Sequence, residues 1–421
     1  IQVSSLDIYI SPIMYVSPMG RDVQFFIKPN ISSAISGTGV YNSQMIPQSQ
    51  APTASTENQS STTTQSSTPT QKTQEETTPE AVENTEASKA TVGTITKESL
   101  MENATGLRPI VVYDSLSVRE GVTLSMAAGV QLYFHDGANL WVHGRIVAEG
   151  TVDRPVVFRG DRTDRMFDYL PYDNTPSRWG GIRLKATSTD NRLNHVDIHS
   201  ASYGIACDSS STDVMKLTLE NSVIHNVGGE GLGLYHCRAS VGNTQISNTL
   251  GHCVAVVGGW AEFVHCTLAQ FYPWDATRGD ALYLANKWLA LDYPLQHAHF
   301  LNCLVTGYAD DVVTGKLEDE NKDVDYYFGN CVLRTVEAED DAARFVGVVY
   351  EKKGEEGTGQ EQFRLFDTDN YLYDFRLKDI SVARGKGSTE WAARYPTDRY
   401  GIDRLTEPTP DAGCYEFVPE E

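Results

Sequence analysis

Short runs of Val, Ile, Leu, Tyr and Phe, interrupted by Gly, Asn, Asp and Ser, recur along the chain from residue 109 onward. Helical periodicity is almost absent, and this pattern is typical of short strands joined by turns. One four-residue pattern, polar then small then variable then branched apolar, returns six times, beginning at His195, Asn221, Asn243, His265, Asn302 and Asn330. The shortest spacing, 22 residues, occurs twice. The longer spacings fit the same period with inserted loops.

This repeat predicts a solenoid of stacked strands. The small and the branched residue of each copy are two positions apart, so they point to the same face of a strand. Coils stacked about 4.8 Å apart would align the small residues into an interior column, formed by Ser222, Thr244, Cys266, Cys303 and Cys331. The preceding Asn suits a turn, because it tolerates unusual backbone angles and its amide can bond the neighbouring coil's backbone. We expect an all-β, right-handed parallel β-helix of about ten coils with a C-terminal cap.

Composition divides the chain into four parts. Residues 48–91 consist almost entirely of Ser, Thr, Gln, Glu, Pro and Ala and contain no aromatic residue, so they cannot bury enough apolar surface to offset the entropy of ordering. We expect a flexible tether over 48–108, the β-helix over 109–350 and the cap over 351–421. Residues 1–47 show strand-like alternation but are too short for a sizeable core, and their role stays open.

Acidic residues outnumber basic ones, with 56 Asp and Glu against 34 Lys and Arg, which gives a formal net charge of −22. This excess repels phosphate backbones and anionic lipid surfaces, so we expect no nucleic-acid partner. No stretch approaches the roughly 20 apolar residues that a membrane span requires, so membrane attachment would need a lipid or a partner. The seven cysteines are widely spaced and contain no C-x-x-C pair, which favours small core residues over disulfides or a zinc site.

Both ends of the expected β-helix resemble a known family. Segments 111–118, 121–124, 129–134, 140–151 and 155–158 resemble the opening coils of Bacteroidota surface β-helix proteins. Segments 373–377, 385–387, 398–404 and 411–416 look like the C-terminal signature of choice-of-anchor Q proteins, although Cys414 stands where that family usually has Ala. The resemblance implies a secreted, commonly lipid-anchored protein on the extracellular face of the bacterial outer membrane. It implies no particular reaction, because a fold does not determine a function.

Aromatic residues gather in loops expected between coils, where a solenoid places its binding surface. The candidate ligand-binding residues are Tyr272, Trp274, Trp288 and Tyr293. Aromatic faces beside carboxylates suit sugar rings, although the same loops could instead fold back and cover the side of the solenoid. Our first hypothesis is a non-enzymatic cell-surface protein that binds a glycan or a surface protein through these loops. An accessory subunit of an outer-membrane complex is an alternative.

The enzymatic alternative is a polysaccharide lyase or glycoside hydrolase of the β-helix type, with Asp280, Asp310 and Asp311 as candidate catalytic acids. We expect Asp310 and Asp311 on a turn near Asp280 of the preceding coil. A lyase would also need a basic residue over these carboxylates to accept a proton, and a hydrolase would need two carboxylates at a set separation. The sequence demonstrates neither arrangement, so the question of catalysis stays open.

Two patterns bear on metal binding, and we expect no cofactor from either. Oxygen ligands alternate at Asp319, Asn321 and Asp323, which leaves calcium open, but the Gly and the terminal Glu of an EF-hand loop are missing. A solvated acidic loop is the preferred interpretation. His297 and His299 share a strand face, as a metal-binding pair would. Because no third ligand is in view, we interpret them as ordinary strand histidines.

Overall fold

The computed structural model describes residues 2–3, 8–10, 110–288, 291–318, 324–338 and 341–419. The chain divides into two units, one formed by 1–29 with 92–421 and the other by 30–91. The predicted tether and nearly all of the N-terminal segment therefore lie outside the described residues. Among the residues that are described, no helix combines the length and the apolar character needed to cross a membrane.

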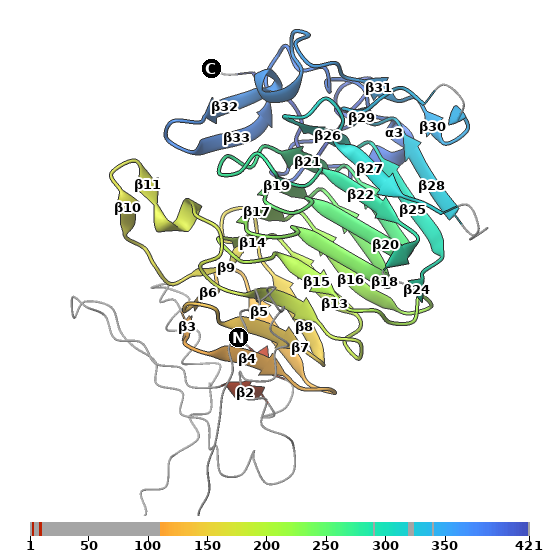
Figure 1. The fold of residues 1–421 in the computed structure, drawn as a ribbon. Coiled ribbons are helices and arrows are strands. Elements are labelled where there is room, and N and C mark those ends of the chain that lie inside the picture. Colours follow the sequence, from red (N-terminus) through yellow and green to blue (C-terminus); the bar gives the residue numbers. More distant parts are fainter. Residues whose placement is uncertain are drawn as a thin grey trace, which may run out of the picture. The chain divides into compact units, whose positions relative to one another are not determined.

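Each coil lays strands on up to three faces, which we call face 1, face 2 and face 3 in the order in which a coil visits them (Figure 1). Face 1 contains β4 (Ser115–Val118), β7 (Asn139–Val142), β12 (Gly181–Leu184), β15 (Ile205–Cys207), β22 (Leu282–Ala285) and β27 (Val313–Lys316). Face 2 contains β5 (Thr123–Ala127), β8 (Arg145–Glu149), β13 (Asn191–Asn194), β16 (Met215–Glu220), β25 (Leu295–Leu301), β28 (Val324–Gly329) and β30 (Phe345–Val346). Two long strands contribute to both of these faces, β18 (Leu232–Gly242) and β20 (Val254–Val264).

Face 3 is a separate sheet of ten strands. It contains β3 (Ile110–Val112), β6 (Gln131–Phe134), β9 (Val156–Gly160), β14 (Val196–His199), β17 (Val223–Val227), β19 (Gln245–Thr249), β21 (Thr267–Gln270), β26 (Leu304–Gly307), β29 (Val332–Leu333) and β31 (Val349–Tyr350). The coil-to-coil pairings on all three faces are parallel, and connections between parallel strands are almost always right-handed. The predicted right-handed parallel β-helix of about ten coils is confirmed.

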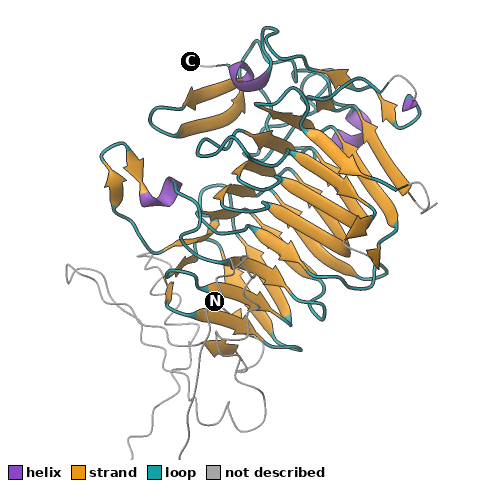
Figure 2. Cartoon of the chain, viewed as in Figure 1, coloured by secondary structure: helices purple, strands orange, loops and turns teal. Residues whose placement is uncertain are grey.

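Other short elements interrupt or flank the coils (Figure 2). Antiparallel strands β1 (Gln2–Val3) and β2 (Ile8–Ile10) pair with β5 and β4. One insert between faces 3 and 1 carries β10 (Arg165–Phe167), β11 (Leu170–Pro171) and the 3-10 helix η2 (Tyr172–Asn174), and another between faces 1 and 2 carries β23 (Lys287–Trp288) and β24 (Leu291–Asp292). The C-terminal part contains η4 (Gly359–Gln362), the hairpin β32 (Phe363–Asp367) and β33 (Leu372–Leu377), and α3 (Thr389–Ala392).

The polar position of the repeat lies in the tight turn between faces 2 and 3. Six residues there have φ between 47° and 53°, namely His195, Asn221, Asn243, His265, Asn302 and Asn330. This left-handed conformation favours Asn over most side chains. The Asn221 amide donates to Asn194 Oδ1 at 2.8 Å, and the Asn243 amide donates to Asn221 Oδ1 at 3.1 Å. The predicted bond to the backbone of the neighbouring coil is replaced here by bonds between Asn side chains of successive coils. The Asn243 amide also donates to the Thr397 carbonyl of the C-terminal segment at 2.8 Å.

The predicted interior column is also present, and all seven cysteines are free and buried. Its members stack from coil to coil, since the Cys303 N–H donates to Cys331 Sγ at 3.4 Å. Each hydroxyl or thiol can donate to the carbonyl two residues earlier, as Thr244 does to Gly242 at 2.8 Å and Cys303 to Leu301 at 3.4 Å. Ser, Thr and Cys can alternate in this column because each is small and supplies one donor at the same point of the turn.

The segment predicted as a cap packs along the outer side of face 3. A second apolar cluster joins face-3 residues such as Ala269 and Leu304, together with Phe271 just after β21, to C-terminal residues such as Phe363, Phe375 and Tyr415. The Tyr415 hydroxyl also donates to the Gln245 side chain on β19 at 2.6 Å. The last residues of the chain therefore cover the flank of several coils.

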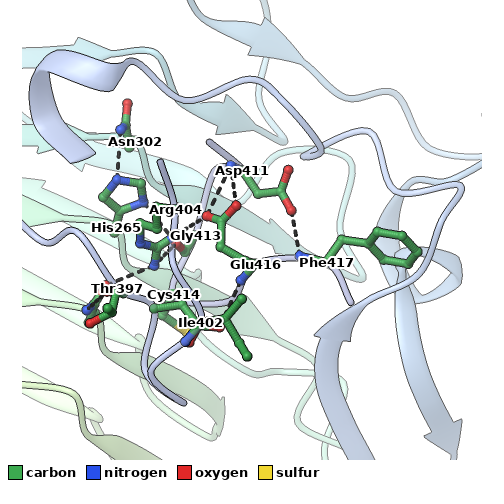
Figure 3. A network of polar contacts seen from close by, with 12 residues as sticks. His265, Asn302, Thr397, Ile402, Arg404, Asp411, Gly413, Cys414, Glu416 and Phe417 are labelled. Atoms are coloured by element: carbon green, nitrogen blue, oxygen red, sulfur yellow. Dashed lines mark hydrogen bonds and ion pairs between the residues drawn. The ribbon is translucent and has the colours of Figure 1, made fainter. Parts of the chain in front are cut away.

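Polar contacts fasten this segment to the turn column (Figure 3). Fully buried Arg404 donates to Asn243 Oδ1 at 2.9 Å and to the Gly413 carbonyl at 3.1 Å, and it pairs with Glu416. The Gly413 N–H in turn donates to the Asn302 carbonyl at 2.8 Å. The C-terminal segments 398–404 and 411–416 thus recognise the repeated turns themselves.

Candidate functional site

An open groove of about 420 Å³ runs along the outer side of face 1. Its floor is formed by Ala206 on β15 and Gly233 on β18, which are adjacent in the parallel register. Arg183 on β12 precedes them in the same row, and Ala255 on β20 continues it. The face is hollowed beyond Arg183 because β15, β18 and β20 carry only Ala, Gly and Ala at this outward position.

Four aromatic residues line the groove: Tyr203, Tyr235, Trp288 and Tyr293. The Tyr235 ring folds back over Gly233, where an added Cβ would come within 2.9 Å of it. Trp288 meets Tyr235 edge to face, with ring centroids 5.7 Å apart, and 46% of Trp288 is exposed. The groove therefore presents both a fixed ring and an accessible one to a ligand.

The insert that carries Trp288 and Tyr293 is held against the coils by a few specific contacts. The Asn286 side chain exchanges two 2.9 Å hydrogen bonds with the backbone of Glu318 in the next coil. The Tyr293 N–H donates to the Asn286 carbonyl at 2.8 Å. Gly258 has a φ of 65°, and a Cβ there would lie only 2.5 Å from Tyr293 Cβ. Glycine at this position allows the insert to approach the groove closely.

Two cations at the groove, Arg183 and Lys185, are balanced by two carboxylates, Asp208 and Glu230. Asp208 lies 2.7 Å from Arg183 Nε and 2.9 Å from Lys185 Nζ. Burial opposes its charge, but the hydrogen bonds from Lys185 and Arg183 prevail and lower the pKa of Asp208. Glu230 lines the groove and forms no ion pair within the described part of the chain. Burial raises the pKa of Tyr235 to about 12, so its hydroxyl stays protonated.

The four aromatic residues selected from the sequence separate into two places. Trp288 and Tyr293 line the groove, whereas Tyr272 and Trp274 do not. Tyr272 is only 3% exposed, so its ring offers almost no surface to a ligand. Trp274 stacks on Tyr371 from the β32–β33 hairpin with ring centroids 4.1 Å apart. The contact attaches the loop that contains Trp274 to the C-terminal part of the chain. This agrees with the alternative that the aromatic loops fold back and cover the side of the solenoid.

The acidic candidates have separate partners, and none of them lines the groove. Asp280 accepts a hydrogen bond from Thr314, and Asp310 lies 3.4 Å from Lys353 Nζ. Asp311 accepts a backbone N–H two residues later at 3.1 Å. Asp280 and Asp310 therefore contact other segments of the chain, and only the Asp311 contact is local. The calcium candidates lie outside the described residues: Asp319, Asn321 and Asp323.

A chain of ion pairs crosses the outer side of face 3. His199 is 7% exposed, and its Nδ1 lies 2.7 Å from Asp197 while its Nε2 lies 2.9 Å from Asp173 of the insert that carries β10 and β11. Arg159 Nη2 lies 2.9 Å from the same Asp173 carboxylate, and His225 Nε2 lies 3.3 Å from Asp197. Burial opposes a charge on His199, but the two carboxylates prevail and raise its pKa to about 10. The resulting imidazolium fastens the insert to the sheet.

The histidine pair on β25 has a carboxylate beside it. Asp325 on the adjacent strand β28 places Oδ2 3.5 Å from His297 Nδ1 and 3.1 Å from His299 Nε2. The third group that the sequence did not reveal therefore comes from the next coil.

Sequence reasoning missed several residues of the groove, namely Arg183, Tyr203, Glu230 and Tyr235. A signal was present in the outward positions of three consecutive coils, where Ala206, Gly233 and Ala255 are all small. Small residues at the same outward position in successive coils indicate a furrow. This row can be recognised only after the coils have been aligned in the correct register.

Comparison with known proteins gives limited matches. Residues 1–46 match the family model described as cell surface heme-binding protein Shp. No curated protein matches the chain. Among solved structures, the chain is similar to the pectate lyase Pel9A, with a TM-score of 0.34 and 12% sequence identity over 75% of this chain and 90% of that chain. A likeness this distant says nothing about activity or substrate.

Proposed function

We propose that the protein is a non-enzymatic binding protein and that the groove on face 1 holds a carbohydrate chain. The observation that carries this proposal is the combination of a side-chain-poor floor with four aromatic residues along one furrow. Aromatic rings pack against the apolar faces of sugars, while carboxylate and guanidinium groups bond their hydroxyls. Polysaccharide cleavage in the same groove and docking of a surface protein are the competing functions.

The charge of the groove favours a neutral glycan over an acidic one. Asp208 already neutralises one of its two neighbouring cations, Arg183 and Lys185, and Glu230 adds a second negative charge. The whole chain carries a formal net charge of −22. An acidic polysaccharide would therefore meet repulsion at long range and little compensation inside the groove.

Replacing Trp288 with alanine is expected to weaken binding of a neutral oligosaccharide about tenfold or more, because truncating a central aromatic contact typically costs more than about 1.4 kcal/mol. A glycan array would identify the ligand, and calorimetry would give the dissociation constants. Phe167→Ala is the matched control, since Phe167 is 55% exposed and lies outside the groove. Equal affinity of Trp288→Ala and wild type would contradict the proposal. Release of shortened products that stops in Glu230→Gln would instead establish an enzyme.

We further propose that the chain is displayed on the extracellular face of a bacterial outer membrane by a lipid anchor, with residues 48–108 as the spacer. The choice-of-anchor Q resemblance of 373–416 supports this location, and so does the match of residues 1–46 to a family named for a cell-surface protein. Protease added to intact cells is expected to cleave the spacer and release the β-helix. Protection of the chain until the cells are lysed would contradict surface display. Co-purification with outer-membrane proteins would favour the accessory-subunit alternative.

A further inference from the structure

Three side chains from two adjacent coils converge on the outer side of face 2. They are His297 and His299 on β25 and Asp325 on β28, and their ligand atoms all lie within 4.8 Å of one another. Asp325 Oδ2 is 3.5 Å from His297 Nδ1 and 3.1 Å from His299 Nε2. A zinc ion about 2.0–2.2 Å from each ligand would hold tetrahedral ligand atoms roughly 3.4 Å apart. The observed separations therefore suit a shared metal ion with little rearrangement.

A bulge in β25 creates this arrangement. Leu295 pairs with Val324 and Ala298 pairs with Tyr326, so Gln296 and His297 together face Asp325 alone. The extra residue lets His297 point outward on the same side as His299, while Leu295 and Ala298 remain in the core. Bulges often redirect a side chain at a functional position.

Stacking fixes the His297 ring. It lies parallel to Trp260 on β20, with centroids 4.5 Å apart and an interplanar angle of 5°. Arg238 on β18 covers Trp260 at 4.5 Å from the ring centroid. His297 Nε2 is buried and has no hydrogen-bond partner in the described part of the chain. Packing rather than hydrogen bonding therefore holds this imidazole beside His299 and Asp325.

We propose that His297, His299 and Asp325 form a binding site for a divalent transition-metal ion such as Zn²⁺. Two imidazoles and a carboxylate are the donor set that zinc, nickel and copper accept, and a fourth position stays open to solvent or to a ligand. Asp325 is 53% exposed and the histidines are 19% and 24% exposed, so the ion can enter from solution. The site is independent of the groove on face 1.

Another set of possible ligands, Asp197 with His199 and His225, is less suitable. Both nitrogens of His199 already contact carboxylates, at 2.7 and 2.9 Å. A metal would have to break one of these contacts and detach the insert that Asp173 secures. At the His297 site a metal would replace contacts between its own three ligands, chiefly the 3.1 Å contact of His299 Nε2 with Asp325 Oδ2. No insert is secured by that contact.

Zinc titration of the tag-free, metal-free full chain tests the proposal. Calorimetry is expected to show one equivalent of Zn²⁺ bound with micromolar affinity, and Co²⁺ is expected to give visible absorption bands of a low-symmetry site. His299→Ala and Asp325→Asn should each weaken zinc binding at least tenfold. His225→Ala is the matched control from the other set and should leave the affinity unchanged.

Thermal melting of each variant without metal shows whether the β-helix is intact. Zinc that binds His299→Ala as tightly as wild type, or that is lost in His225→Ala instead, would overturn the proposed site. The same conclusion would follow if the wild-type chain bound no zinc at micromolar concentrations.

Discussion

Replacing His199 with glutamine is expected to lower the free energy of unfolding at pH 6 by about 3–5 kcal/mol, which is the usual cost of breaking a buried ion pair by removing one partner. The variant would leave the carboxylates of Asp197 and Asp173 facing each other without the cation between them. Glutamine can donate to one of them but carries no charge. Urea unfolding followed by circular dichroism measures the difference.

The loss should depend on pH in a defined direction. The pKa of His199 is about 10 in the folded chain and about 6.5 in an unfolded one. A raised folded-state pKa gives stability that is complete below about pH 6.5 and disappears as pH rises toward 10. The pKa of Asp197 is lowered by His199 despite burial, so its contribution is present above its unfolded pKa, near 3.9, and is lost in stronger acid. Wild type and His199→Gln should therefore differ most between about pH 4 and 6.5.

His135→Gln is a suitable control for this series. His135 Nδ1 also lies 2.7 Å from a carboxylate, that of Asp161, but 42% of its side chain is exposed. A solvent-exposed pair contributes at most about 1 kcal/mol. A His199→Gln variant with a constant deficit from pH 6 to pH 10 would show that the loss comes from packing and not from the imidazolium.

The repeat allowed the interior of this protein to be predicted because the interior depends on local rules. A residue in the left-handed turn, such as Asn243, and a small donor after it, such as Cys303 after Asn302, obey the same constraint in every coil. Period and side-chain direction then determine which residues stack. This prediction of the stacked residues does not require the number of residues inserted between coils.

The exterior could not be predicted in the same way, because it depends on which coils are adjacent and on how the inserts fold. The sequence indicates Trp288 and Tyr293 as aromatic residues of an insert, but their ring partners, Tyr235 and His236, lie more than 50 residues earlier on β18. Asp325 reaches His297 only because β25 carries a bulge opposite it. Trp274 stacks on Tyr371, which lies nearly 100 residues later in the sequence. Such contacts follow from register and bulges, which single residues do not reveal.

The second large effect is expected at Arg404, where methionine should lower the free energy of unfolding of the C-terminal segment by about 3–5 kcal/mol. The side chain is fully buried, and its loss would leave the Glu416 carboxylate, the Gly413 carbonyl and Asn243 Oδ1 without their shared donor. Methionine fills similar space, so a cavity contributes little. Hydrogen exchange should show the segment opening before the coils do, because the substitution leaves the strand-to-strand hydrogen bonds of the coils intact.

A double variant shows whether the uncompensated charge of Glu416 causes the loss of stability in Arg404→Met. Burial raises the pKa of Glu416 to about 7 although Arg404 opposes the shift, so glutamine resembles the protonated form that the site tolerates. Adding Glu416→Gln to Arg404→Met should therefore recover part of the lost stability, because no uncompensated charge remains. Arg162→Met is the control: Arg162 pairs with Asp164 at 2.5 Å on an exposed loop and should change stability by less than about 1 kcal/mol. If the double variant were as unstable as the sum of the two single ones, the pairing with Glu416 would not be what fastens the C-terminal segment to the turn column.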